Sequence, residues 1–178
     1  MVISPDSMQS LNKQAKKAYE HGDYENAADL FTELYQACDK NGDEVNSAEN
    51  KNNCSVCFLK AEMPQKALDI VEGTDLVFAE RGDKKRQAMA LGNRAAALEA
   101  LCKIDQAYSD YQKASLILKE INDQEMRPYI LKSIAALEIR KGDYLQSLAT
   151  TKASIDSSNK LSKREKFLRK LLGLIFKD

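Results

Sequence analysis

Residues 21–31 read HGDYENAADLF, and residues 141–151 read KGDYLQSLATT. Both stretches contain Gly-Asp-Tyr, and in each a small side chain follows three residues after the tyrosine. The two copies lie 120 residues apart, a distance that divides into three steps of 40. A short phrase that recurs at such a distance calls for a search for an internal repeat, because repeats determine the fold class.

Three independent series of residues follow the 40-residue step. The first series consists of small residues, Ala27, Ala67, Ala107 and Ser147. The second is also small, Ala15, Ser55, Ala95 and Ala135. The third consists of Asp43, Asp83 and Asp123, each preceded by Gly or Asn. The shared period predicts four repeats of 40 residues, approximately 4–42, 43–82, 83–122 and 123–161, within a single domain over 1–178.

Within a repeat the apolar spacing is helical rather than alternating. In the third unit the apolar positions of two successive helices are Leu91, Ala95, Leu98 and Leu101, then Ile104, Ala107, Tyr108, Tyr111 and Ala114. Gly or Asn suits the left-handed end of a helix, and the Asp after it can accept backbone N–H groups of the next helix. Each unit is therefore predicted to be a helical hairpin whose two helices cross closely at the small residues.

This pattern resembles the tetratricopeptide repeat family. The matching residues are Leu11, Ala15, Ala27 and Phe31 in unit one, and Leu91, Ala95, Leu98, Ala107 and Tyr111 in unit three. The departures are Lys51 and Glu138 at normally apolar places, and the lack of a closing proline. The family's usual repeat is about 34 residues, so the resemblance is to its forty-residue versions, such as those of kinesin light chains and cell-polarity adaptors. Armadillo- or HEAT-type units are the structural alternative.

The resemblance implies an all-α, right-handed α-solenoid of four hairpins, followed by a capping helix at 162–178. Lys+Arg and Asp+Glu number 27 each, so the overall charge does not point to nucleic acid. The N-terminus has no apolar run typical of a secretory signal, and four cysteines do not make a disulfide framework. A cytoplasmic location is the expectation.

Candidate catalytic and metal-binding residues are few. Cys54 and Cys57 form a CxxC pair, but they lie mid-helix, without a second pair or a histidine in the same unit. His21, the only histidine, precedes a turn glycine near a helix end, and Gly92 is expected to admit close packing or a ligand backbone. We therefore predict a non-enzyme with no catalytic residue, no metal and no cofactor.

The resemblance places the first helix of each hairpin along a concave groove that binds a peptide. The residues it predicts there are Asn12, Lys16, Tyr19, Asn52, Asn53, Val56, Leu59, Met89, Asn93, Lys132 and Arg140, with Lys13, Glu99, Tyr129 and Ser133 beside them. Asparagine recurs at the 40-residue step, and its amide can bond to both the C=O and the N–H of an extended chain. The carboxylate clamp of the family's chaperone adaptors is not predicted, because only Asn53 matches it.

Residues 159–178, NKLSKREKFLRKLLGLIFKD, differ in character from the repeats. They contain seven basic and two acidic residues, and Ser162 with Glu165 forms a capping box that starts a helix. One interpretation is a cap that covers the last hairpin. The other is a basic amphipathic segment for an anionic membrane surface or a partner, and self-association is a further possibility.

The sequence thus predicts a protein-interaction module, or adaptor, that binds a peptide segment of a partner in its concave groove, with an acidic segment favoured. The alternative is a structural assembly or membrane-docking factor that acts through residues 162–178.

Overall fold

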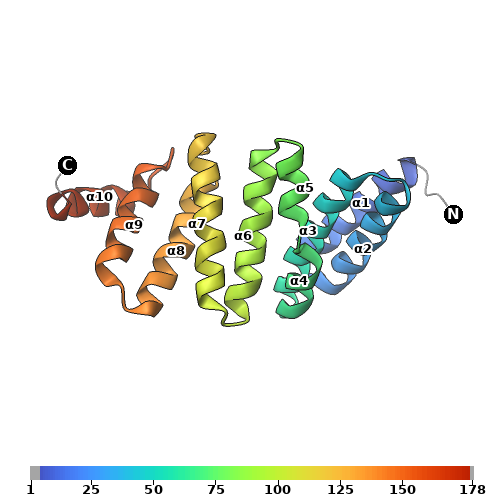
Figure 1. The fold of residues 1–178 in the computed structure, drawn as a ribbon, viewed down its shortest axis with the longest axis horizontal. Coiled ribbons are helices and arrows are strands. Elements are labelled where there is room, and N and C mark those ends of the chain that lie inside the picture. The colour runs from blue at the N-terminus through green and yellow to red at the C-terminus, as the bar shows by residue number, and fades with distance from the viewer. Residues whose placement is uncertain (1–4, 177–178) are drawn as a thin grey trace.

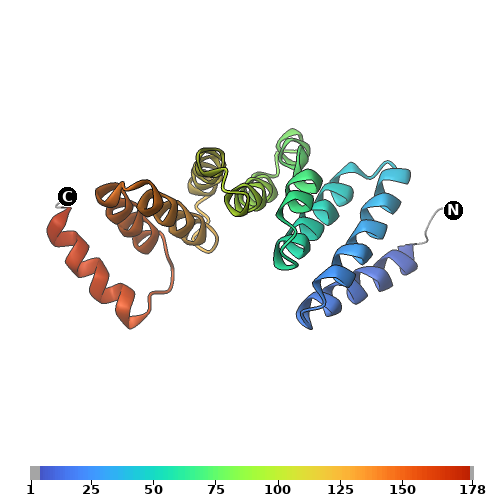
Figure 2. The same cartoon turned by 90° about the horizontal axis from the view of Figure 1, so that it is seen from below.

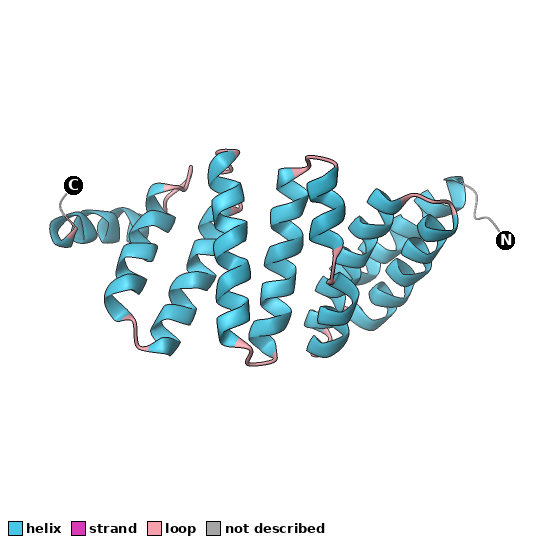
Figure 3. Ribbon diagram, in the orientation of Figure 1, coloured by secondary structure: helices cyan, strands magenta, loops and turns pink. Residues whose placement is uncertain are grey.

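The computed structural model describes residues 5–176, which consist of helices joined by short loops (Figures 1 and 3). The helices are α1 (Pro5–Glu20), α2 (Tyr24–Lys40), α3 (Glu44–Lys60), α4 (Pro64–Val71), α5 (Thr74–Glu80), α6 (Lys84–Ala100), α7 (Ile104–Glu120), α8 (Arg127–Lys141), α9 (Tyr144–Asp156) and α10 (Lys163–Ile175). Within the described residues no helix is long and apolar enough to span a membrane. Residue 4 of the first predicted unit and residues 177–178 of the predicted C-terminal helix lie outside this range.

Successive helices pair into hairpins that follow one another along the long axis of the molecule, from the N-terminus to the C-terminus (Figures 1 and 2). The pairs are α1 with α2, α3 with α4 and α5, α6 with α7, and α8 with α9. The last helix, α10, packs against α9. Because each hairpin contacts chiefly its neighbours, the architecture is the predicted all-α solenoid, which is confirmed.

The small residues of the first two 40-residue series, here called the ladders, lie where the helices of a hairpin meet. Ala95 and Ala107 are fully buried in one apolar cluster. In the second hairpin the hydroxyl of Ser55 donates a 2.8 Å hydrogen bond to the carbonyl of Ala67. The fourth hairpin has the corresponding bond, 3.0 Å long, from Ser147 to the carbonyl of Ala135. The 40-residue ladders therefore mark close helix crossings, as predicted.

The turn inside each hairpin places one residue in the left-handed region of backbone space, again at steps of 40. Gly22 and Gly142 do so in the outer hairpins, with φ of +79° and +85°. Glu62 and Cys102 take the same place in the inner hairpins, with φ of +59° and +58°. Left-handed backbone costs a residue with a Cβ about 1–2 kcal/mol, so the inner turns form because the packed helices on both sides hold them.

One second helix is interrupted, which the periodicity did not predict. In the second hairpin α4 ends at Val71 and α5 begins at Thr74, with Gly73 left-handed between them at φ +77°. The hydroxyl of Thr74 donates a 2.8 Å hydrogen bond to the carbonyl of Val71. The bend is therefore a closed turn in which an unpaired carbonyl of α4 finds a donor.

Glu138 of α8 is a carboxylate in the core. It is 1% exposed, and its Oε1 accepts a 3.0 Å hydrogen bond from the hydroxyl of Tyr108. Its Oε2 is buried and has no hydrogen-bond partner among residues 5–176. The residues 40 and 80 positions earlier are Leu98 and Phe58, which are apolar. Glu138 thus departs from the repeat pattern at a cost in desolvation.

We expect Glu138→Leu to raise the free energy of unfolding by about 1–3 kcal/mol, because the substitution removes a buried oxygen that lacks a partner. Tyr108 is only half-buried, so water can replace its lost acceptor. Urea denaturation of the two proteins measures the change. Glu138→Gln is the matched polar control and should give a smaller gain; a destabilised Glu138→Leu would show instead that the carboxylate stabilises the hairpin.

Candidate functional site

The first helices of the last three hairpins are joined by polar contacts between hairpins. Asn93 of α6 donates a 3.1 Å hydrogen bond from Nδ2 to Oδ1 of Asn52 in α3. Arg140 of α8 lies 3.4 Å from Glu99 of α6. These contacts make α3, α6 and α8 a continuous face; together with α1 it is called the groove face here, and it carries all eleven residues predicted to bind a peptide.

The asparagines of the groove face are not equivalent. Asn52 is 8% exposed, its Nδ2 donates to the carbonyl of Ala48 at 2.9 Å, and its Oδ1 is taken by Asn93. The pair that lies 40 residues earlier is Asn12 and Asn53, and it differs. Oδ1 of Asn12 is buried without a partner in the described residues, and the half-buried Asn53 makes no side-chain hydrogen bond there. One amide pair is therefore closed, and the preceding one is open.

The series of asparagines at the 40-residue step does not continue beyond the closed pair, because the residue 40 positions after Asn52 is Gly92. A Cβ at Gly92 would lie 3.0 Å from Cδ1 of Ile130 in α8. Of the two roles expected for this glycine, close helix packing is therefore the one that the geometry supports. Asn93 and Asn52 thus form the last amide pair of the groove face toward the C-terminus.

The cationic side chains of the groove face fall into two groups. Lys132 of α8 lies 3.1 Å from Glu165 of α10, and Arg140 pairs with Glu99, so both are neutralised by neighbours. Lys13, Lys16 and Lys17 of α1 are exposed and form no ion pair with any residue in the range 5–176. The uncompensated positive charge therefore lies at the N-terminal hairpin rather than along the whole face.

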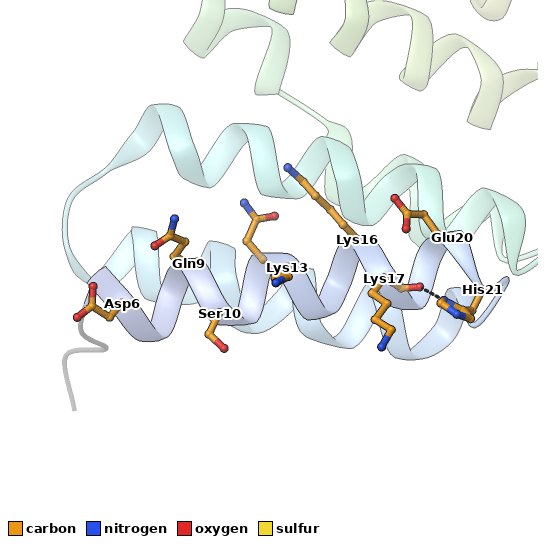
Figure 4. Close-up of a pocket in the computed structure, with 9 residues that line it drawn as sticks. Asp6, Gln9, Ser10, Lys13, Lys16, Lys17, Glu20 and His21 are labelled. Atoms are coloured by element: carbon orange, nitrogen blue, oxygen red, sulfur yellow. Dashed lines mark hydrogen bonds between the residues drawn. The ribbon is translucent and has the colours of Figure 1, made fainter.

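The lysines of α1 border a surface pocket. Its lining comes from α1 and the first residue of the turn that follows, and consists of Asp6, Gln9, Ser10, Asn12, Lys13, Lys16, Lys17, Glu20 and His21. Figure 4 shows Lys16 and Glu20 on one side of α1, Ser10 and Lys17 on the other, and Lys13 between them. The ring of His21 approaches the carbonyl of Lys17 at 2.7 Å, which places it at the helix end as expected. Asn12 also lines this pocket, while its unpaired Oδ1 is itself buried.

The apolar residues of the groove face become more exposed toward the C-terminal half. Val56 and Leu59 of α3 are half-buried, whereas Met89 of α6 and Tyr129 of α8 are exposed. Tyr19 of α1 is different, because it packs edge-on against Tyr24 with ring centroids 5.4 Å apart. It therefore contributes to the first hairpin's packing as well as to its surface.

The CxxC pair is buried in the first apolar cluster. Cys54 and Cys57 are almost inaccessible to solvent, and Sγ of Cys54 lies 3.5 Å from the carbonyl of Ala28. Burial raises the pKa of Cys57 to about 12, with the neighbouring Cys54 adding to the effect. A thiol with such a pKa is protonated at neutral pH and is neither a nucleophile nor a good metal ligand. Within residues 5–176 no cluster of His, Cys, Asp and Glu is arranged to hold a metal ion.

Sequence reasoning missed one polar network, which lies on the side of the second helices. Arg94 of α6 donates to Asp110 of α7 at 2.7 and 3.1 Å, and to Asp75 of α5 at 2.9 Å. Both carboxylates are buried. A signal was present, because the residues 40 before and after Arg94 are Cys54 and Ile134, so the arginine stands between two apolar residues in repeat register.

Comparisons with known proteins agree with this architecture. No family model matches the sequence. A stretch of 112 residues, 63% of this chain, is 32% identical to Protein unc-45 homolog B of Danio rerio. The match covers 11% of that protein, so the chain spans about a tenth of the length of this relative.

Solved structures of helical repeats superpose on most of the chain. One is a kinesin light chain of Podospora anserina with nearly identical TPR-like repeats; it has a TM-score of 0.76 at 11% identity, over 96% of this chain and 87% of that one. Another is BtubC (BKLC) from P. vanneervenii, with a TM-score of 0.73 at 18% identity, over 96% of this chain and 66% of that one. The hairpins, their buried small residues and these superpositions together show that the chain is a TPR-like α-solenoid.

Proposed function

We propose that the chain is a non-catalytic interaction module that binds an extended, acidic segment of a partner protein along its groove face. Solenoids of stacked hairpins present long binding surfaces of this kind. The observation that carries the proposal is the open amide pair, Asn12 and Asn53, beside three lysines that lack ion-pair partners.

The open amide pair is suited to a peptide main chain. A buried carbonyl oxygen without a donor, such as Oδ1 of Asn12, costs free energy until a donor arrives. On binding, the amide of Asn12 would turn outward, so that an extended segment offers an N–H group to its oxygen and a C=O group to the amide of Asn53. The closed pair of Asn52 and Asn93 has fewer free bonding groups, so we place the main-chain contacts chiefly at the first two hairpins.

Charge favours an acidic ligand at the same end. Lys13 and Lys16 lie on the pocket of α1 that contains Asn12, and neither forms an ion pair within residues 5–176; the pocket's three lysines outnumber its two carboxylates, Asp6 and Glu20. Exposed charges interact over about a Debye length, roughly 8 Å at physiological ionic strength. Binding that depends on these lysines should therefore weaken as salt is added.

Apolar contacts would discriminate among acidic segments. Met89 and Tyr129 are exposed on α6 and α8, two and three hairpins away from the lysines. Methionine adapts to differently shaped side chains, and tyrosine contributes a large rigid surface. The ligand we infer is thus acidic at one end and carries apolar side chains toward the C-terminal hairpins.

We expect Asn53→Ala to weaken binding by about 0.5–1.5 kcal/mol, the contribution of one net hydrogen bond, with the melting temperature almost unchanged. Peptides selected from a random displayed library on the wild-type protein supply the ligands, and isothermal calorimetry measures each variant. Lys13→Glu with Lys16→Glu should weaken binding further and flatten its salt dependence.

Lys119→Glu, an exposed lysine on α7 away from the groove face, is the matched charge control and should bind like the wild type. Selected peptides that lack acidic residues, or that bind equally well to the Asn53 and lysine variants, would contradict this assignment of the groove face.

The alternative function, assembly or membrane docking through residues 162–178, uses a separate surface. Apart from the contact of Glu165 with Lys132, α10 makes no hydrogen bond or ion pair with a predicted groove residue within the described chain. A failure of one surface would therefore leave the other testable.

A further inference from the structure

We propose that the outward side of α10 is a docking surface for an anionic phospholipid bilayer, on which the helix lies flat. This surface is independent of the groove face. The inference depends on how α10 is held, on which of its side chains remain exposed, and on the charges around them.

One side of α10 anchors the helix to the solenoid. Leu172 is 1% exposed and Leu168 is half-buried, on the side that meets α9. Arg169 lies 2.8 Å from Asp156 at the end of α9. At the other end of the helix, the hydroxyl of Ser162 and the carboxylate of Glu165 complete the predicted capping box, which is confirmed. The helix is thus formed before any ligand arrives and has a fixed orientation.

A second side of α10 is apolar and open to solvent. Phe167 is 70% and Leu174 73% exposed, and Leu171 and Ile175 are also exposed. The spacing of these residues, four, three and one, places them on one sector of a helix with 3.6 residues per turn. A cap needs only the side that meets α9, so burial against the solenoid does not account for this sector.

A third side is basic and lies next to the apolar sector. Lys163, Lys166 and Lys170 follow the helical spacing of three and four residues and are all exposed. These lysines form no ion pair within residues 5–176, and neither do Arg164 and Lys160. The nearby carboxylates are already engaged, since Glu165 pairs with Lys132 and Asp156 with Arg169. The basic sector is therefore uncompensated.

This division of a solvent-facing surface matches a helix at a lipid–water interface. Such helices bury an apolar side at the boundary of headgroups and acyl chains, while lysines reach back to anionic headgroups. The net charge of the whole chain is zero, and residues 159–178 carry seven basic and two acidic residues, so the rest carries a net charge of −5. An anionic surface would attract α10 and repel the remainder, which orients the molecule.

A second copy of the chain is the less favourable occupant of the same surface. Pairing two α10 helices through their apolar sectors would bring two sets of unpaired lysines together, and like charges in contact oppose association. An anionic bilayer supplies the missing negative charge and needs no groove or matching side chains on the protein. Charge complementarity therefore favours the lipid surface.

Vesicle flotation of the full chain tests the proposal, with vesicles of phosphatidylcholine alone and vesicles in which a third of the lipid is phosphatidylserine. We expect the protein to float only with the anionic vesicles and to be released by salt. Lys166→Glu with Lys170→Glu should weaken binding by at least about 30-fold, since each lysine near such a surface contributes roughly fivefold. Phe167→Ser with Leu174→Ser should weaken it by at least about 10-fold.

Matched controls come from exposed residues of the third hairpin. Leu116→Ser removes an exposed leucine from α7, and Lys103→Glu with Lys119→Glu reverses two exposed lysines. Both should bind vesicles like the wild type. Circular dichroism melts should be unchanged for all four variants, because every altered side chain is exposed.

Three results would overturn the proposal: no binding of the wild type to anionic vesicles, equal binding of the α10 variants, or equal losses in the controls. Sedimentation velocity without lipid covers the other occupant; a dimer that the α10 variants abolish would assign the surface to a second copy. Because none of these variants lies on the groove face, the outcome is distinct from that of the peptide-binding test.

Discussion

Replacing Arg94 by alanine is expected to lower the free energy of unfolding by about 3–5 kcal/mol, the usual cost of removing one partner from a buried ion pair. Among residues 5–176, Arg94 is the only side chain that forms an ion pair with Asp75. It also donates two hydrogen bonds to Asp110. Both aspartates are buried, with relative exposures of 8% and 6%. Hydrogen bonding to Asp110, with the charges of both aspartates, raises the pKa of Arg94 above its ordinary value. The substitution would leave the buried Asp75 without a partner and Asp110 with only the exposed Lys113, 3.4 Å away.

The loss should also weaken the attachment of α5. This helix has seven residues, Thr74–Glu80, and follows the bend at Gly73, so it is too short to be stable alone. Guanidinium denaturation measures the global change, and hydrogen exchange of the α5 amides measures the local one. The triple variant Arg94→Met, Asp75→Asn, Asp110→Asn is the control; it removes all three charges and should recover part of the loss. A change below about 1 kcal/mol in Arg94→Ala would mean that water solvates the aspartates, as in exposed pairs.

Ala107→Leu should destabilise the chain by about 1–3 kcal/mol or more, because extra methylene groups in a packed core force the helices apart. Ala107 has no exposed surface and belongs to the same apolar cluster as Ala95 of the facing helix. Its counterparts in the second and fourth hairpins, Ala67 and Ser147, lie in a crossing close enough for a hydrogen bond between the two helices. A leucine would thus displace α6 from α7 in the middle of the solenoid.

Leu116→Ala is the control for this substitution on the same helix. Leu116 is 62% exposed, so truncating it should change stability by no more than about 0.5 kcal/mol. Thermal melts of both variants decide the matter, and a melting temperature for Ala107→Leu equal to that of the wild type would show that the crossing has room for a large side chain.

The sequence by itself was sufficient to predict the hairpins and their stacking. A small residue at a helix crossing is required by the short distance between backbones, and the requirement recurs in each unit, so Ala15 and its counterparts are visible as a ladder. The same holds for Asp43 and Asp83, whose carboxylates accept N–H groups of Asn46 and Arg86 at the start of the next helix. The small crossing residues and the capping aspartates are both required by local backbone geometry, and this geometry recurs in every repeat.

Features that depend on a contact between one particular pair of helices could not be predicted from the repeat period. The bend at Gly73 occurs in one second helix, and the ion pairs of Arg94 join residues from three helices that no shared register connects. The amides show the limit most clearly, because Asn12 with Asn53 and Asn52 with Asn93 are the same pair in sequence register. One pair is closed by a hydrogen bond and the other is open.

The C-terminal helix shows the same division. Ser162 and Glu165 were enough to predict where α10 begins, since a capping box is a contact within four residues. Its sequence also shows the apolar and basic residues, but it does not show which of the apolar residues meet α9. Burial of Leu172 and exposure of Phe167 and Leu174 follow from how α10 docks on the last hairpin. The 40-residue period determined the hairpins because backbone distances recur in every unit; only the tertiary structure decided which amides, charges and apolar side chains remain free, because each depends on the particular helix that packs beside it.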